Sequence, residues 1–180
     1  MTILKIDSSI NGEASVSRQL TSAIIDQLRN AAPHSAVITR DLAADPLDHL
    51  TLAAFGDTSV IDEFLAADTV VIGAPMYNFG VPSQLKAWID RLAVAGKTFR
   101  YTATGSEGLV NGKRVIVAIS RGGFYDAASQ FEHAESYLRS VFQFMGVTPE
   151  FVAADGTAIS PEQRDAAIAN GLNEIHALAA

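Results

Sequence analysis

Hydroxyl side chains gather just after the first apolar run of the chain. Ser9 precedes a predicted helix that begins near Ser15 and Ser17. Serine hydroxyls and the free N–H groups of a helix N-terminus bind anions well, and Arg18 could add positive charge. Neither G-x-G-x-x-G nor a P-loop pattern is present, which favours one terminal phosphate over a pyrophosphate or triphosphate. The alternative is that Ser15 or Ser17 only caps the helix.

A second candidate loop, MYNFG, follows the β-branched run Thr69–Ile72. This run predicts a strand that is buried on both sides, and Gly73 and Pro75 are expected to end it. The side chains of the loop suit a flat heteroaromatic ligand, with apolar area and one amide. They are Met76, Tyr77, Phe79 and Asn78. The alternative is a connecting loop whose aromatic residues only fill the core.

A third loop reads Ser120-Arg121-Gly122-Gly123-Phe124-Tyr125 and follows the apolar run Arg114–Ile119. Two adjacent glycines allow close approach of a ligand, and their N–H groups can face a carbonyl or a developing anion. Right-handed crossovers place this loop at the same edge of the sheet as the first two. The three loops together therefore predict the walls of one pocket.

No protein group offers an obvious nucleophile, base or metal ligand set. The chain has no cysteine, and its four histidines show no ligand-like spacing, so no metal site is expected. No G-x-S-x-G elbow presents a serine nucleophile. Any enzymatic chemistry is therefore expected to come from a cofactor.

Short apolar runs alternate with amphipathic patterns along the whole chain. Strands are expected at Ile3–Asp7, Ala36–Arg40, Thr69–Ile72, Arg114–Ile119 and around Phe151–Ala153. Helices are expected over residues 15–30, 58–66, 82–92, 131–145 and 161–178. This alternation predicts one α/β domain over residues 1–180, a doubly wound five-stranded parallel sheet of flavodoxin-like order 2-1-3-4-5. A Rossmann order usually needs a sixth strand and is less favoured.

Two helices have features that place their core faces. Leu85, Trp88, Ile89 and Leu92 share one face of the helix that Pro82 opens. The helix over residues 131–145 is expected to turn Phe131 inward and to end at Gly146. Residues 97–113 interrupt the alternation and predict an irregular or hairpin excursion near the pocket end of the sheet.

Composition limits the class of protein. A hydrophobic content of 48% and a mean hydropathy of +0.18 exclude a disordered chain. A net charge of −7 and a pI near 4.9 argue against nucleic acid or an anionic membrane as partner. No run approaches a membrane-spanning length and no secretory signal opens the sequence, so a soluble cytoplasmic protein is expected.

Taken together, the motifs resemble those of the FMN-dependent NADH azoreductases, in the flavodoxin-like quinone reductase superfamily. The matching pieces are S-x(5)-S-x-S-R, A-P-M-Y-N-F followed by P-S-Q-L-K-A-W-I-D, K-T-F-R-Y-T and S-R-G-G. They occur in the family's order and cover most of the chain.

The resemblance implies a set of cofactor contacts. The FMN phosphate would be held by Ser9, Ser15, Val16 and Ser17. The ribityl chain and isoalloxazine would contact Met76, Tyr77, Asn78 and Phe79. The pyrimidine side of the ring would be bordered by Ser120, Arg121, Gly122 and Gly123.

The resemblance also implies an activity and an assembly. The chain would pass two electrons from NADH or NADPH, through one FMN per subunit, to quinones or azo compounds by a ping-pong mechanism. The family is homodimeric, with flavin sites at the subunit interface, which offers a use for the aromatic excursion around Phe99 and Tyr101.

Two departures from the family pattern bear on the substrate. Residues 41–68 look shorter than in many relatives, where this segment helps to build the cleft wall. Phe124 and Tyr125 stand where some relatives have an aliphatic residue and a histidine. Our hypothesis is that Phe124 or Tyr125 packs on the substrate. Protons would come from solvent or from Tyr125.

Two other classes of protein remain as alternatives. A flavodoxin-type electron carrier would have no organic substrate, but it typically has a compact phosphate loop and a strongly acidic docking face. A receiver-type regulatory domain would need a phosphorylatable aspartate after the third strand, where this chain has Ala74-Pro75. The enzyme is therefore the favoured interpretation.

Overall fold

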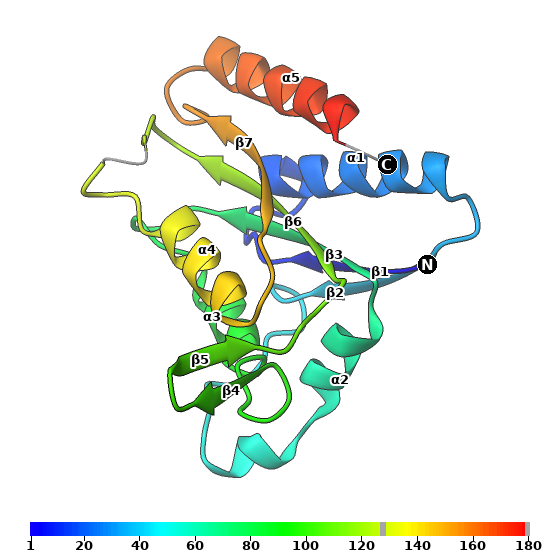
Figure 1. The fold of residues 1–180 in the computed structure, drawn as a ribbon. Helices are drawn as coiled ribbons and strands as arrows, with labels where there is room; N and C mark the ends of the chain where they lie inside the picture. Colours follow the sequence, from blue (N-terminus) through cyan, green and yellow to red (C-terminus); the bar gives the residue numbers. More distant parts are fainter. Residues whose placement is uncertain (127–128, 179–180) are drawn as a thin grey trace.

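The computed structural model describes residues 1–126 and 129–178, which fold around a five-stranded parallel sheet (Figure 1). The strand order is β2-β1-β3-β6-β7, which confirms the flavodoxin-like order expected from the sequence. The strands are β1 (Thr2–Asp7), β2 (Ala36–Asp41), β3 (Thr69–Pro75), β6 (Arg114–Arg121) and β7 (Glu150–Asp155).

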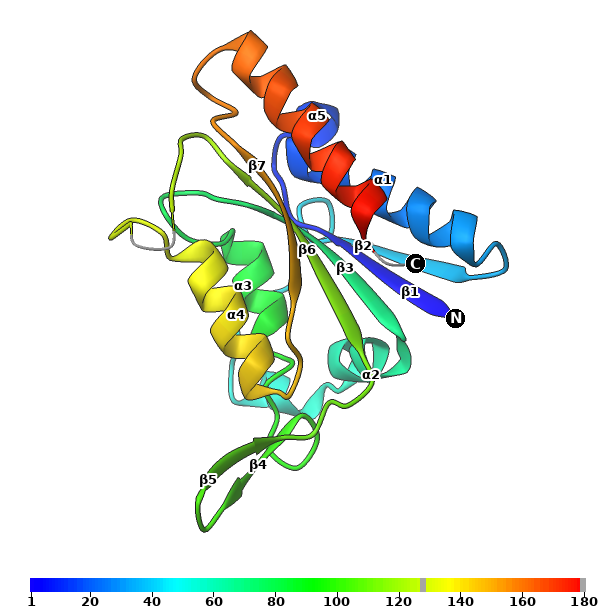
Figure 2. The same cartoon turned by 45° about the horizontal axis from the view of Figure 1, so that its top comes forward.

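Helices cover both faces of the sheet. In Figures 1 and 2, α1 (Val16–Ala31) and α5 (Pro161–Ala177) lie on one face, while α3 (Ser83–Ile89) and α4 (Ala134–Phe144) lie on the other. The shorter α2 (Ser59–Ala66) packs with α3 and α4. Short 3-10 turns occur at Gly12–Ala14 and Ala53–Gly56. Among the described residues, none of the helices has both the length and the apolar character needed to cross a membrane.

The sequence of β3 explains why it lies in the middle of the sheet. Val70 and Ile72 join the core beneath α2, α3 and α4, whereas Val71 joins the core beneath α1 and α5. Successive side chains of a strand point to opposite faces, so a central strand between two helical layers must be apolar at every position. All seven residues of β3 are buried accordingly.

The expectation that Gly73 helps to end this strand is wrong, because β3 continues through Gly73, but the strand does end at Pro75 as expected. Pro75 is the last residue of the strand, where its missing N–H leaves the rest of the ladder intact. Gly73 allows α1 to pack closely on the sheet. A Cβ at Gly73 would lie 3.1 Å from both Asp7 Oδ1 and Thr21 Cγ2.

The helix boundaries agree with the sequence in part. Leu85, Trp88, Ile89 and Leu92 are all buried as expected, although α3 itself ends at Ile89. The helix expected from residue 131 begins only at Ala134. Phe131 therefore precedes α4 and is 47% exposed, so its expected inward position is wrong. Gly146, with φ +97°, follows the end of α4 as expected.

The excursion between α3 and β6 is a hairpin of β4 (Phe99–Thr102) and β5 (Gly105–Gly108). The hairpin lies at the edge of the sheet where the strands begin (Figures 1 and 2). The expectation that it lies near the pocket end is therefore wrong. Val110 N–H, just after β5, donates to the carbonyl of Met145 at the end of α4, at 3.0 Å. The order of the elements explains this position. α3 runs back from the pocket edge to the edge where β6 must begin, and the hairpin lies between α3 and β6 in the sequence.

Candidate functional site

The loop between β1 and α1 buries its hydroxyl groups. Ser9, Ser15 and Ser17 are at most 2% exposed. Ser15 caps α1 by accepting a hydrogen bond from the N–H of Arg18 at 3.2 Å, and its Oγ lies 3.1 Å from that of Ser17. The hydroxyls therefore lie at the positively polarised end of a helix, where an anion is stabilised. Capping and anion binding are compatible here, since a hydroxyl has more than one hydrogen-bonding capacity.

The side chain of Arg18 holds the loop in place. Its Nη1 and Nη2 donate to the two carboxylate oxygens of Asp41, each at 2.7 Å, and Nη2 also donates to the carbonyl of Ser9 at 2.9 Å. The hydrogen bond from Arg18 lowers the pKa of Asp41 to about 2. Asp7 lies a further 3.8 Å from Nη1. The Nε of Arg18 is buried without a protein partner. Asp41 and Asp7 therefore largely neutralise the charge of Arg18, whereas the sequence analysis expected this residue to add positive charge to an anion site.

The loop after β3 is a tight turn with strained backbone. Tyr77 and Gly80 exchange two backbone hydrogen bonds, at 2.9 and 3.1 Å. Asn78 and Phe79 between them have φ of +48° and +70°, as a type I′ turn requires. Asparagine tolerates this region, but a bulky phenylalanine rarely adopts it. Backbone strain of this kind is concentrated at functional sites.

The hydroxyl of Tyr77 joins the second loop to the first. It lies 3.2 Å from Ser9 Oγ and accepts a hydrogen bond from Ile10 N–H at 3.2 Å. On the other side of the turn, Met76 N–H donates to the carbonyl of Ser120 at 2.8 Å. Three loops that lie far apart in the sequence are therefore linked directly at one edge of the sheet.

The third loop presents backbone to the site, while the side chain of Arg121 is engaged elsewhere. The guanidinium of Arg121 is buried and pairs with Asp155 at 2.9 Å, with Glu135, and with Glu132 at 3.7 Å. Burial opposes its charge, but Asp155 and Glu135 raise the pKa of Arg121 above its usual value.

A fourth loop, which the sequence analysis did not single out, completes the site. Thr157 donates through both its N–H and its Oγ1 to the carbonyl of Arg121, each at 3.0 Å, and Ala158 N–H donates to the carbonyl of Gly122 at 3.0 Å. From the first turn of α5, Arg164 Nη2 donates to the carbonyl of Ala14 at 2.5 Å. Topology could have identified this loop, because the carboxyl end of β7 must lie at the same edge.

A cavity of about 200 Å³ lies between the four loops. Seven of the residues predicted from the sequence line it: Ser9, Ser15, Val16, Met76, Tyr77, Ser120 and Gly122. The unpredicted lining residues are Asn11, Pro75, Thr157, Ala158 and Arg164. A more open hollow of about 750 Å³ adjoins it, shares Met76 and Tyr77, and includes Asn78. Ser17, Phe79, Arg121 and Gly123 line neither of these two spaces.

An exposed aromatic group lies beside the tight turn. The ring of Phe79 packs on Phe131 at a centroid distance of 5.1 Å and on Tyr125 at 6.4 Å. His133 N–H donates to the carbonyl of Phe79 at 3.1 Å. Phe124 is 66% exposed and available to a ligand at this edge. The contact with Phe79 explains why Phe131 lies outside α4 and not on its buried face.

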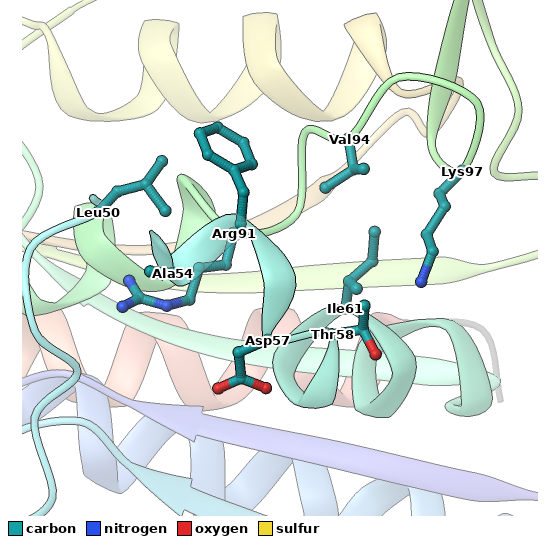
Figure 3. A pocket seen from close by; sticks show the side chains of 9 residues that line it. Leu50, Ala54, Asp57, Thr58, Ile61, Arg91, Val94 and Lys97 are labelled. Atoms are coloured by element: carbon teal, nitrogen blue, oxygen red, sulfur yellow. The ribbon is translucent and has the colours of Figure 1, made fainter. Parts of the chain in front are cut away.

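Figure 3 shows a separate hollow between residues 50–61 and the segment after α3. Its volume is about 20 Å³, which is enough for a water molecule but not for an aromatic ring. Within the described residues, no group of three or more His, Asp or Glu side chains could hold a metal ion. The four-loop cavity is therefore the best candidate site.

Comparison with known proteins gives matches over nearly the whole chain. A family model described as a flavodoxin-like fold matches residues 1–179. The chain is 52% identical, over an alignment of 201 positions including gaps that covers all of both proteins, to FMN-dependent NADH:quinone oxidoreductase 2 of Bradyrhizobium diazoefficiens. It is 54% identical over 190 residues to the FMN-dependent NADH:quinone oxidoreductase of Rhizobium meliloti, covering 94% of this chain and 92% of that one.

Solved structures agree with these relatives. The azoreductase AzrA superposes with a TM-score of 0.88 at 30% identity, over 97% of each chain. An azoreductase from Bacillus anthracis superposes with a TM-score of 0.85 at 29% identity, again over 97% of each chain. The chain therefore belongs to the flavodoxin-like family that includes the FMN-dependent NADH:quinone oxidoreductases.

Proposed function

We propose that this chain is an FMN-dependent oxidoreductase that passes two electrons from NADH or NADPH to quinones and azo compounds. The observation that carries the proposal is the cavity at the N-terminus of α1, where buried Ser9 and Ser15 hydroxyls face three further loops. This donor set fits a single phosphate group, which is what FMN would present. The names of the relatives at 52% and 54% identity support the choice of cofactor, donor and acceptor.

In this proposal, the residues of the chain bind and orient the flavin. The hydroxyls of Ser9 and Ser15, with the N–H of Val16, hold the phosphate, and the buried Ser17 hydroxyl supports them through its contact with Ser15 at 3.1 Å. Residues 76–79 contact the ribityl chain and the ring, and the backbone of residues 120–123 borders the pyrimidine side. Arg121 contributes only its backbone, because its guanidinium is paired with three carboxylates.

FMN, when bound, would supply the redox chemistry, accepting a hydride from the nicotinamide and then passing two electrons to the acceptor in a ping-pong cycle. Gly122 and Gly123 allow a ring to approach the backbone because they carry no side chain. Phe124 or Tyr125 packs on the acceptor above this loop. Replacing each with alanine should change quinone preference more than FMN retention; identical kinetics with several acceptors would reject that role.

We further propose a single-domain cytoplasmic protein that forms a homodimer with one FMN per subunit. The resemblance to the azoreductase family supports this assembly. Analytical ultracentrifugation of the purified protein tests it, and a monomer at micromolar concentration would contradict it.

The visible spectrum of the purified protein, with the released chromophore identified by mass, tests the function. A yellow protein that releases FMN is expected. Anaerobic stopped-flow mixing with NADH or NADPH should then bleach the bound flavin directly, and a quinone should restore its colour. Bound FMN that neither nucleotide reduces would indicate a flavodoxin-type carrier, and a chain that ignores added FMN would refute the proposal.

A further inference from the structure

The phosphate-suited end of the four-loop cavity would bind an anion more tightly with a cation beside its neutral donors, because the chain as a whole carries a net charge of −7. The negative charge of such a protein weakens the binding of a dianionic phosphate, and a local positive charge offsets this effect. The arginine that the sequence places at this loop, Arg18, is already paired with Asp41 at 2.7 Å and lies 3.8 Å from Asp7. The other arginine next to the site, Arg121, is held by three carboxylates.

Arg164 differs from both of these arginines. It lines the cavity together with Ser9 and Ser15, and it is only partly buried. Among residues 1–126 and 129–178, no carboxylate lies within 4.0 Å of its guanidinium nitrogens, so Arg164 forms no ion pair there. Its Nη2 donates to the carbonyl of Ala14, directly before the capping serine of α1. That hydrogen bond places the guanidinium at the phosphate-suited wall while leaving its other N–H groups free to donate.

The stability of α5 does not account for this residue. Arg164 is the fourth residue of α5, close to the positive end of the helix dipole. A cation there is unfavourable for the helix, and acidic residues are preferred at such positions. Ser160 already caps the helix by accepting from Gln163 N–H at 3.1 Å. A negatively charged ligand in the cavity would explain why an arginine occupies this position.

We propose that Arg164 is a ligand-specificity residue that pairs with the terminal phosphate of the bound flavin and makes the site select FMN over riboflavin. The inference rests on the proposed function. Serine hydroxyls and helix N–H groups then supply neutral donors from α1, and Arg164, held beside them by the carbonyl of Ala14, adds a charged donor. The last loop of the sheet therefore belongs to the cofactor site, although its sequence contains no phosphate-binding motif.

The test is a comparison of FMN and riboflavin, which differ only in the phosphate. Apoprotein is titrated with each flavin, following the quenching of flavin fluorescence, for the wild type and for Arg164→Gln. We expect FMN affinity to fall on the order of tenfold, the effect of losing one hydrogen-bonded charge pair, and riboflavin affinity to stay unchanged. Arg164→Lys should recover part of the loss, and added salt should weaken FMN binding more in the wild type than in Arg164→Gln.

Arg29→Gln is the matched control, because it removes the same charge from an exposed position at the far end of α1. Equal losses for FMN and riboflavin, equal losses in Arg29→Gln, or unchanged FMN affinity in a folded Arg164→Gln would each overturn the inference while leaving the proposed function intact. A wild-type chain that binds neither flavin would overturn both.

Discussion

The hydroxyl of Tyr77 is a sensitive point for a direct test of how the loops cooperate. Tyr77→Phe removes one oxygen and leaves the ring in place. That oxygen lies 3.2 Å from Ser9 Oγ and accepts from Ile10 N–H at 3.2 Å. These contacts are the side-chain connection between the loop after β3 and the loop after β1.

The expected magnitude follows from the geometry of these contacts. Both are longer than the usual hydrogen bond, so each should contribute about 0.5 kcal/mol, the low end of the usual range. Ile10 is 64% exposed, so water replaces the lost acceptor in the free protein. Stability should therefore fall by less than about 1 kcal/mol. FMN affinity should fall by about fivefold, which corresponds to about 1 kcal/mol, because the ligand must now order two loops that were previously joined.

The assay compares FMN titration of the apoprotein with urea unfolding of the same sample. Trp88 is the single tryptophan of the chain and is fully buried, so its fluorescence reports unfolding. Tyr101→Phe is the matched control, since Tyr101 is 76% exposed on the hairpin at the opposite edge of the sheet. FMN affinity that is unchanged in Tyr77→Phe, or equally reduced in Tyr101→Phe, would refute the idea that the two loops act as one unit.

Three further variants test the supporting structure by urea unfolding. Arg18 lowers the pKa of Asp41 from 3.8 to about 2, so this pair contributes stability above pH 4 that is lost as the pH falls towards 2. Asp41→Asn should make the fall in stability between pH 4 and 2 shallower, and a slope equal to that of the wild type would contradict the assignment. Gly73→Ala should lower the free energy of unfolding by about 1–3 kcal/mol, because the added methyl group overpacks the contact with α1. Gly56→Ala is the control and should leave this free energy unchanged, since no atom lies within 4 Å of its added methyl group. Equal effects of the two substitutions would contradict the close approach of α1. Arg121→Met leaves three carboxylates without their buried cation and should cost about 3–5 kcal/mol; near-neutral unfolding would show that solvent already screens the cluster.

Sequence reasoning succeeded where a local pattern dictates a unique outcome. The uninterrupted apolar run at the start of β3 predicted a strand buried between two helical layers, and the alternation of such runs with amphipathic patterns predicted the fold class. The buried stripe of α3 followed from helical spacing. The last helix was expected to begin at residue 161, and α5 does begin at Pro161 with Ser160 as its cap, a pair of residues typical of a helix start.

The misses have physical causes outside the local sequence. Phe131 fits the helical period of α4, but its contact with Phe79, more than fifty positions away, holds it outside the helix. Arg18 looks like a phosphate ligand until Asp41, on a neighbouring strand, takes its guanidinium. The fourth loop lines the cavity because β7 lies next to β6 in the sheet, and no sequence motif in this loop indicates that position. Side-chain partners across the sheet are therefore what sequence patterns leave undetermined.

The distribution of the four loops along the chain also has a consequence during synthesis. They occupy positions near residues 10, 77, 121 and 157, so the last wall of the cavity is made only after most of the polypeptide has left the ribosome. Arg164 and Ala14, which are hydrogen-bonded beside this cavity, lie 150 positions apart in the sequence. The cavity is therefore complete only when these distant segments have come together.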